Sequence, residues 1–305
     1  MKFVWMVMFL VLSACATKQD VPPPFEVVEK EEVSLRESLA LVNNYAVTYY
    51  EDALWNSEEG KQIGLSYFRE RGFSDATMKT FALGYSLDKN NAFIEASKKS
   101  GHNLEHLKRL GLSKEGQYGD YDFFRGRVMF PIRNISGRCL GFGGRTLKSE
   151  VKAKYLNSPE SELYDKSKTL YGMYEAKRSI IQADHCFIVE GYTDVISLHQ
   201  AGIEYAVSSS GTSLTAGQIK TIKRYTHNVS LLFDGDQAGI KAAVRGIDLL
   251  LEEGMNVKVV MFPDNHDPDS FARSVSSTEL ERYLKEEATD FTDFMLEALL
   301  KGSEN

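Results

Sequence analysis

Carboxylates follow three apolar runs of strand length in the second half of the sequence. Because the carboxyl ends of parallel strands meet at one edge of a sheet, we expect these acids to converge there. Carboxylates that converge in a partly dry cleft repel one another, and a bound cation would compensate their charge. The acids are Glu190, Asp234, Asp236, Asp267 and Asp269.

The ligand types predict a hard divalent cation at this edge. Oxygen ligands without His or Cys favour Mg²⁺ or Mn²⁺ over zinc. In Asp234-Gly235-Asp236 two side chains lie on the same side of an extended segment, and the glycine allows a tight turn or a phosphate to approach. Asp267-Pro268-Asp269 repeats this arrangement with a rigid middle residue.

Strands and helices alternate from residue 185 onward, which is the pattern of a small doubly wound α/β domain. Parallel strands joined through helices form a sheet with covered faces and right-handed crossovers. We expect Ser213 to cap the second helix and Gly254 to end the third. The expected strands are 186–189, 205–208, 229–233 and 257–262, and the expected helices are 193–201, 214–225 and 238–253.

The segment before residue 179 has the pattern of an α+β domain. Apolar residues recur at helical spacing over 35–50 and again over 60–71. Two β-type runs, 127–132 and 139–144, flank a turn at 134–137 and predict a hairpin.

A cluster of cations interleaved with aromatic side chains lies in this first domain. The whole chain has a formal net charge of -7, so we expect no bulk attraction to nucleic acid. A local cationic surface with aromatics for base stacking would still hold a template strand or triphosphates. The alternative is a solvated basic face packed by ordinary core aromatics. The cations are Arg125, Arg127, Arg133, Arg138, Arg145, Lys148, Lys152 and Lys154.

Length and cysteine content set further bounds. With 305 residues, of which 43% are hydrophobic and 26% charged, the chain is long enough for two modest globular domains. Cys15, Cys139 and Cys186 include no CxxC pair, so we expect neither a disulfide framework nor a zinc site in this chain.

Three motifs closely resemble, in order and spacing, the toprim module of DnaG-type primases. They lie at 189–195, 232–239 and 267–269, and read VEGYTDV, LFDGDQAG and DPD. Five upstream segments resemble the amino-terminal subdomain of the primase polymerase core, so the resemblance covers about residues 35–300. These upstream segments are 67–73, 83–85, 127–132, 141–145 and 154–160.

The resemblance implies roles for individual residues. Glu190 would be the general acid/base or an acid close to the metal, and the other four acids of the edge would be metal ligands. We count Glu190, Asp234 and Asp236 as catalytic. Asp194 would either add a ligand from the first turn of its helix or cap that helix. The residues expected to contact template or nucleotide are Arg127, from the cationic cluster, and Arg145, Lys154, Asn157 and Lys166.

The expected function is that of a DNA primase catalytic core, a DNA-directed RNA polymerase that makes short RNA primers by metal-dependent nucleotidyl transfer. The expected partners are a single-stranded DNA template and ribonucleoside triphosphates, and we expect a monomer. The expected domains are a leader or linker (1–34), a basic primase subdomain (35–178), the toprim domain (179–272) and a truncated helical C-terminal subdomain (273–305).

Two other functions remain open. A toprim nuclease would use the same acids to nick DNA without triphosphates. A non-catalytic exported lipoprotein with a decayed primase body would carry palmitate on Cys15. No zinc-ribbon motif precedes residue 35. We therefore expect the zinc-binding and helicase-binding parts of a primase to be missing, and the replicative helicase to be a partner only if its binding domain is present elsewhere.

The first residues conflict with a role in replication. The apolar run 3–12 and the sequence Leu12-Ser13-Ala14-Cys15 resemble the signal and lipobox of an exported lipoprotein. A polymerase would find neither template nor triphosphates after export, so we expect a cytoplasmic protein whose first segment is a spurious start or belongs to a gene fragment. Three prolines at 22–24 and the glutamates after them predict an extended acidic linker over 21–34.

Overall fold

The structure is a computed structural model and describes residues 25–211, 213–233, 237–263 and 266–303. The chain divides into two units, Met1–Leu35 and Arg36–Asn305. Asp234, Asp236 and the lipobox-like segment 12–15 lie outside the described residues. In the part of the chain that is described, no helix combines the length and the apolar character needed to cross a membrane.

The first described element is α1 (Phe25–Asn56), a helix of 32 residues. The prediction of an extended linker over 21–34 is therefore wrong from Phe25 onward. No Gly or Pro occurs within α1, so its backbone propensity favours a helix. In the second unit, α1 buries one stripe of side chains at helical spacing: Leu39, Val42, Ala46, Tyr50 and Leu54.

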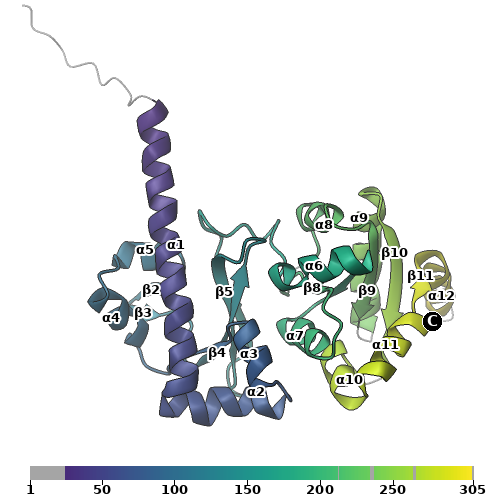
Figure 1. Cartoon of the computed structure of the whole chain (residues 1–305), viewed down its shortest axis with the longest axis horizontal. Helices are drawn as coiled ribbons and strands as arrows, with labels where there is room; N and C mark the ends of the chain where they lie inside the picture. Colours follow the sequence, from purple (N-terminus) through teal and green to yellow (C-terminus); the bar gives the residue numbers. More distant parts are fainter. Residues whose placement is uncertain (1–24, 212, 234–236, 264–265, 304–305) are drawn as a thin grey trace, which may run out of the picture. The chain divides into compact units, whose positions relative to one another are not determined.

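The N-terminal subdomain (residues 36–178) is built on a four-stranded antiparallel sheet of order β1-β4-β5-β6. Figure 1 labels its central strands, β4 and β5. β4 and β5 form the predicted hairpin, and the side chain of Asn134 accepts backbone N–H groups within its turn. The strands of this sheet are β1 (Gly84–Ser86), β4 (Arg127–Arg133), β5 (Cys139–Thr146) and β6 (Tyr155–Asn157).

Short helices and a two-stranded ribbon complete this subdomain. The expected helix over 60–71 is present as a π-helical turn, η1 (Gly60–Leu65), that continues into α2 (Ser66–Glu70). The other elements are α3 (Asp75–Thr80), α4 (Ala92–Lys99), α5 (Leu104–Arg109) and the ribbon of β2 (Ser113–Gly116) and β3 (Gly119–Asp122).

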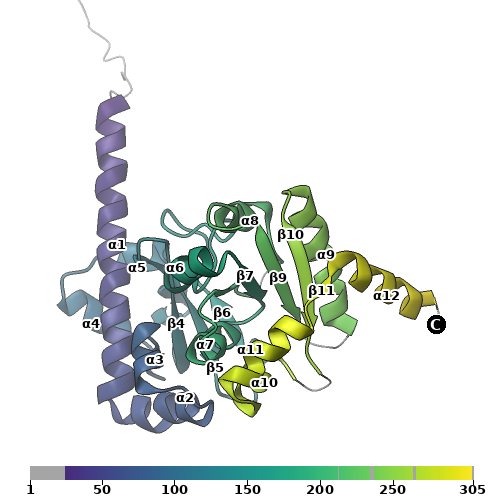
Figure 2. The ribbon, with the colours of Figure 1, turned by 45° about the vertical axis from the view of Figure 1, so that its right-hand side comes forward.

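The C-terminal subdomain (residues 179–303) contains a five-stranded sheet of order β11-β10-β9-β7-β8. Its first four strands in sequence are parallel, as the alternation of strands and helices predicted. Figure 2 shows β7, β9 and β10 side by side, with α9 beside β10. The strands are β7 (Cys186–Val189), β8 (Ala206–Ser208), β9 (Asn228–Phe233), β10 (Asn256–Met261) and β11 (Thr289–Asp290).

Seven helices are described around this sheet. The cap of α8 is Thr215 and not the predicted Ser213, because Thr215 and Gln218 exchange side-chain hydrogen bonds with each other's backbone N–H. Gly254 ends α9 in the left-handed region, as predicted (φ +72°). The helices are α6 (Met173–Ala183), α7 (Tyr192–Gln200), α8 (Ala216–Lys223), α9 (Gln237–Glu252), α10 (Pro268–Ser274), α11 (Ser277–Glu286) and α12 (Phe291–Ser303).

The segment after residue 272 adds to this sheet instead of standing apart from it. β11 pairs with β10 in the antiparallel direction and forms the edge of the sheet. Leu280 and Leu284 of α11 are buried on one face of the sheet, and Phe294 of α12 is buried on the other. The described part of 273–305 therefore belongs to the same fold as the strands before it.

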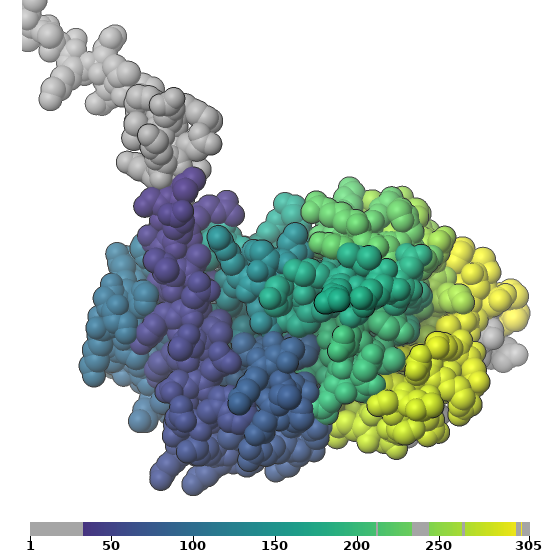
Figure 3. Space-filling view, viewed as in Figure 1, coloured from purple at the N-terminus to yellow at the C-terminus, as the bar shows by residue number. Residues whose placement is uncertain are grey.

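Two hydrophobic cores cover the two faces of the parallel sheet. One contains side chains of α6, α8, α9 and α12 and of the parallel strands. The other is shared with the N-terminal subdomain, and in it the rings of Phe130 and Tyr192 stack with centroids 5.0 Å apart. Figure 3 shows the two subdomains in contact along the face that it draws, blue to teal against green. This shared core fixes β4 and β5 beside α7.

Candidate active site and nucleic-acid interface

Glu190 lies at the carboxyl edge of the parallel sheet, directly after β7, and is exposed. The loop after β8 is hydrogen-bonded to the backbone of Glu190. The hydroxyl of Ser208 donates to the carbonyl of Glu190 at 2.6 Å, and the backbone N–H of Gly211 donates to the same carbonyl at 3.2 Å. Ser210 and Gly211 take the left-handed conformation, with φ of +64° and +74°, which turns the loop back over the strand end.

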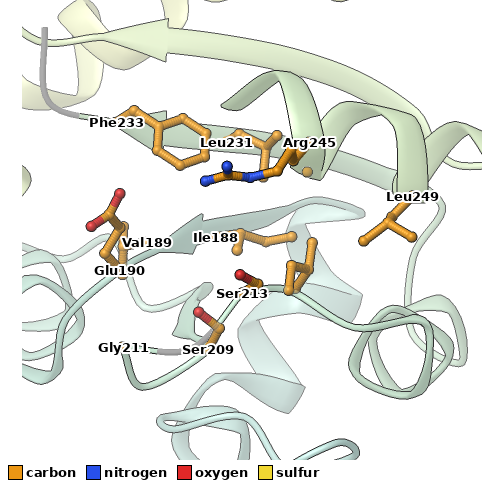
Figure 4. Close-up of a pocket in the computed structure, with 12 residues that line it drawn as sticks. Ile188, Val189, Glu190, Ser209, Gly211, Ser213, Leu231, Phe233, Arg245 and Leu249 are labelled. Carbon is orange, nitrogen blue, oxygen red and sulfur yellow. The ribbon is translucent and has the colours of Figure 1, made fainter. Parts of the chain in front are cut away.

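A pocket of about 310 Å³ opens beside Glu190. Ser209 and Ser213 contribute hydroxyl groups to it, and Arg245 of α9 contributes a guanidinium (Figure 4). Figure 4 shows this guanidinium pointing toward the strand end that carries Glu190. Apolar side chains of β7 and β9, together with Leu214 and Leu249, also line it.

Asp234 and Asp236 follow β9 directly, and their positions lie outside the described residues. The strand that leads to them is described. Leu231 of β9 pairs in parallel register with Ile188 of β7, so β9 runs beside the strand that ends at Glu190. The prediction that these two aspartates ligate a metal stays a prediction.

Asp267 and Asp269 are described, and each has a local partner. Asp267 caps α10 by accepting the backbone N–H of Ser270 at 2.6 Å. Asp269 is buried, with 1% of its side chain exposed, and forms ion pairs with Arg71 and Arg273. It also accepts the hydroxyl of Ser197 at 2.5 Å. These contacts occupy both of its oxygens.

The described residues do not by themselves assemble a metal centre. No group of three or more His, Cys, Asp or Glu side chains that could hold a metal ion occurs among them. Asp194, for which ligation and capping were both open, caps α7 by accepting the backbone N–H of Gly191 at 2.8 Å. The predicted ligation by Asp267 and Asp269 is untested, but here their oxygens serve α10 and the junction between the subdomains.

Arg127 is 7% exposed and lies inside the N-terminal subdomain. Its guanidinium donates to the backbone carbonyls of Gly144, Ala153 and Lys154 at 2.9 to 3.3 Å. A buried guanidinium with these acceptors has little surface for a ligand, and Arg127 attaches the segment before β6 to β4 and β5. The expected contact of Arg127 with nucleic acid stays a prediction.

Arg145 of β5 lies between two tyrosines. One of its terminal nitrogens donates to the hydroxyl of Tyr67 at 2.7 Å and to that of Tyr155 at 3.2 Å. The guanidinium also lies over both rings, 5.2 and 5.4 Å from their centroids. Among the described residues no carboxylate pairs with Arg145, so its charge is available to an anion.

Asn157 joins the two subdomains at the carboxyl edge. Its amide nitrogen donates to the carbonyl of Ser210 at 3.0 Å, and its amide oxygen accepts the hydroxyl of Tyr192 at 2.7 Å. Burial raises the pKa of Tyr192 far above its ordinary value, so this hydroxyl remains a donor at neutral pH. Asn157 therefore holds the loop after β8, whereas a direct nucleotide contact stays a prediction.

The other predicted cations differ in their contacts, and Arg133 and Lys148 are paired with acids. Lys154 is exposed and donates to the carbonyls of Lys148 and Ser149, and the ammonium of Lys148 pairs with Asp88. Arg133 pairs with the buried Glu175. Lys166 is half-buried, and its backbone N–H donates to Glu160. Within the cationic cluster of the sequence, Arg127 is thus buried, and Arg133 and Lys148 are paired with acids.

Both subdomains match known families. A family model described as "DNA primase catalytic core, N-terminal domain" matches residues 49–177, and one described as "Toprim-like" matches residues 187–272. A DNA primase domain from Pseudomonas aeruginosa superposes with a TM-score of 0.81 at 34% identity, covering 87% of this chain and 83% of that one. A DnaG primase catalytic domain bound to single-stranded DNA superposes with a TM-score of 0.78 at 34% identity, covering 88% and 87%.

The chain belongs to the DnaG family of DNA primases. The DNA primase of Clostridium acetobutylicum is 39% identical over 260 residues, which are 85% of this chain and 42% of that protein. The chain thus spans about two fifths of the length of the curated primases that it matches. The sequence resemblance and the expected fold, a toprim sheet preceded by an α+β primase subdomain, are confirmed.

Sequence reasoning missed several residues that the structure places around the toprim edge. Arg71 and Ser197 hold Asp269, Tyr192 holds Asn157, and Arg245 lines the pocket beside Glu190. Arg71 and Asp269 are 198 residues apart in sequence, and no local pattern links them. Tyr192 lies two residues after Glu190, but its polar role depends on a strand of the other subdomain.

Proposed function

We propose that this chain is the catalytic core of a DNA primase, which joins ribonucleotides into short RNA primers on a single-stranded DNA template. The proposal rests on the match of both subdomains to one primase core, with Glu190 at the carboxyl edge of the toprim sheet. The single-stranded DNA bound to a similar catalytic domain supports DNA as the template.

The donor chemistry of the edge fits a hard cation. Described residues that line the pocket offer carboxylate and hydroxyl oxygens and include neither Cys nor His. Glu190, Asp234 and Asp236 would hold Mg²⁺ or Mn²⁺, and Asp267 and Asp269 are further candidates. When bound, the metal supplies Lewis-acid chemistry, which lowers the pKa of a 3′-hydroxyl and neutralises charge on the reacting phosphate.

The residues of the chain would position the reactants. Glu190, exposed beside the pocket, would accept the proton of the 3′-hydroxyl as that oxygen attacks the α-phosphate of the incoming triphosphate. Pyrophosphate would leave, and Arg145 would hold phosphate groups of template or nucleotide. Asn157 would keep the loop after β8 in place during the reaction. Lys154 and Lys166 remain candidate contacts to nucleic acid.

Ribonucleotide incorporation on single-stranded DNA tests the proposal. The full chain would be assayed with Mg²⁺ or Mn²⁺ beside an Asp234→Asn/Asp236→Asn variant. Its matched control is Glu281→Gln/Glu286→Gln, which removes two exposed carboxylates from α11. We expect metal-dependent synthesis by the wild-type chain and by the control, and its loss in the aspartate variant.

Other outcomes redirect the assignment. Metal-dependent nicking of DNA without triphosphates, lost in the same aspartate variant, would favour a toprim nuclease. If a folded chain binds Mn²⁺ but shows no synthesis and no nicking, the result would contradict catalysis by this chain alone.

A further inference from the structure

Two arginines share one buried carboxylate at the junction of the subdomains. Asp269 has 1% of its side chain exposed, whereas Arg71 has 20% and Arg273 has 39%. A buried carboxylate is stable when ionised only if it is paired and hydrogen-bonded, and here Ser197 completes the set of donors. The junction therefore carries more positive than negative charge.

Arg71 continues this cluster toward the nucleic-acid side. Its guanidinium lies 5.1 Å from the centroid of the Tyr67 ring, and the guanidinium of Arg145 lies 5.2 Å from the same centroid. Burial raises the pKa of Tyr67 to about 12, so the ring remains neutral between the two cations. A continuous series of contacts thus runs from Asp269 through Arg71 and Tyr67 to Arg145.

Two like charges beside one ring repel each other unless one of them is compensated. Among the described residues, Asp269 is the acid that forms an ion pair with Arg71 and compensates its charge. Without this carboxylate, Arg71 would compete with Arg145 for the ring and the hydroxyl of Tyr67. Arg145 would then lose the geometry in which two tyrosine hydroxyls fix its guanidinium.

We propose that Asp269 is a positioning residue, which neutralises Arg71 and thereby keeps Arg145 between Tyr67 and Tyr155 as a phosphate-binding cation. The proposal rests on the proposed primase function and assigns a different role to an acid that the sequence pattern presents as a metal ligand. The phosphate belongs either to the DNA backbone or to a nucleoside triphosphate, since both offer the same bidentate acceptor to a guanidinium.

Binding measurements without catalysis test this role. The affinity of the full chain for labelled single-stranded DNA would be measured in EDTA over a series of salt concentrations, and its affinity for ATP in parallel. Removing one phosphate contact to single-stranded DNA lowers the slope of log affinity against log salt by about 0.7. We expect this loss for Arg145→Gln and an equal loss for Asp269→Asn, with no further loss when the two are combined.

The variants distinguish a DNA phosphate from a nucleotide phosphate. A parallel loss of ATP affinity, with the DNA slope unchanged in both variants, would assign the phosphate to the nucleotide. The matched control is Asp75→Asn, which removes one carboxylate from an exposed pair with Arg69 in the same subdomain as Arg145. For Asp75→Asn, the slope of log DNA affinity against log salt and the affinity for ATP should both stay at the wild-type values.

Arg71→Gln/Asp269→Asn separates positioning from folding. It removes both charges of the Arg71–Asp269 pair and leaves the more exposed Arg273 as the remaining cation, so it remains measurable if Asp269→Asn does not fold. We expect this double variant to have the wild-type slope, because no cation then competes with Arg145. A reduced slope and reduced ATP affinity in the folded double variant would overturn the proposal.

Mn²⁺ binding by the same variants tests the alternative role of Asp269, that of a metal ligand. If Asp269 is a positioning residue, Asp269→Asn and the double variant bind Mn²⁺ as the wild-type chain does. Loss of Mn²⁺ binding with unchanged affinity for DNA and ATP would identify Asp269 as a metal ligand and contradict the proposal. Because neither readout requires primer synthesis, failure of the primase proposal would be seen separately.

Discussion

Arg127 and Arg145 lie in neighbouring strands of one sheet but have different surroundings. Arg127 begins β4 opposite Thr146, the residue that follows Arg145 in β5. Burial lowers the pKa of Arg127, and three backbone carbonyls accept its hydrogen bonds. Arg145 keeps part of its surface and donates to two tyrosine hydroxyls. The number of cations in a segment therefore overstates how many can bind phosphate.

Arg127→Met should destabilise the fold without changing DNA binding. Hydrogen bonds from a charged group are worth about 1.5–3 kcal/mol, so we expect a loss of about 2 kcal/mol in the free energy of unfolding. Urea denaturation measures this loss, and the salt dependence of DNA affinity should stay at the wild-type slope. Arg138→Met, at the exposed end of the hairpin, is the control and should change stability by less than about 0.5 kcal/mol. A lower slope with unchanged stability would restore Arg127 as a nucleic-acid contact.

What sequence can predict at the residue scale depends on how local the partner is. The cap of α10 by Asp267 and the cap of α7 by Asp194 can be predicted from the sequence, because the partner of each cap lies three residues away. The burial of Asp269 cannot be predicted from the local sequence, because it depends on Arg71, which belongs to the other subdomain. An acidic motif at a strand end therefore identifies the edge but not which carboxylate faces a ligand.

Elements with a strong pattern are placed as predicted, and those without one are not. The hairpin of β4 and β5 and the four parallel strands follow from apolar runs and turn residues. β11 spans only Thr289–Asp290 and has no readable periodicity. The capping box of α8, from Thr215 to Gln218, is present in the sequence, so the choice of Ser213 overlooked an available signal.

Gly143→Ala should destabilise the contact between β5 and α7. A Cβ at Gly143 would lie 2.4 to 2.6 Å from two ring carbons and the hydroxyl oxygen of Tyr192, so the side chain or the strand would have to move. Overpacking of this kind typically costs about 1–3 kcal/mol, and we expect a loss in that range in urea denaturation. Displacement of Tyr192 should also weaken its hydrogen bond to Asn157 and release the loop beside Glu190.

Gly246→Ala is the matched control for this substitution. In the interior of α9 the added Cβ would lie 3.4 Å from the nearest atom, a methyl carbon of Leu231, which is an ordinary contact. Replacing a helix-interior glycine by alanine typically stabilises by about 0.5–1 kcal/mol, so the two alanine variants should change stability in opposite directions. If Gly143→Ala proves as stable as the wild-type chain, close contact at Tyr192 does not determine the spacing of these elements.

At the scale of the whole second unit, one core joins the two subdomains. It contains Phe68 and Phe130 from the N-terminal subdomain and Val189, Leu232 and Val260 from three strands of the toprim sheet. Polar contacts at Asp269 and Asn157 lie beside this core and cross the same junction. A shared core of this kind favours cooperative unfolding, because neither subdomain can separate without exposing its buried face.

We therefore expect one unfolding transition that both subdomains report together. In a Trp5→Phe background, Trp55 of α1, which packs against the shared core, reports the N-terminal subdomain by fluorescence, while far-ultraviolet circular dichroism reports all the helices. Leu232→Ala, in the shared core, and Leu231→Ala, in the core on the other face, should each cost about 2–5 kcal/mol. In a cooperative molecule both substitutions move the Trp55 transition as far as the circular dichroism transition. If Leu231→Ala shifts only the dichroism, the toprim sheet unfolds independently and the shared core does not couple the two subdomains.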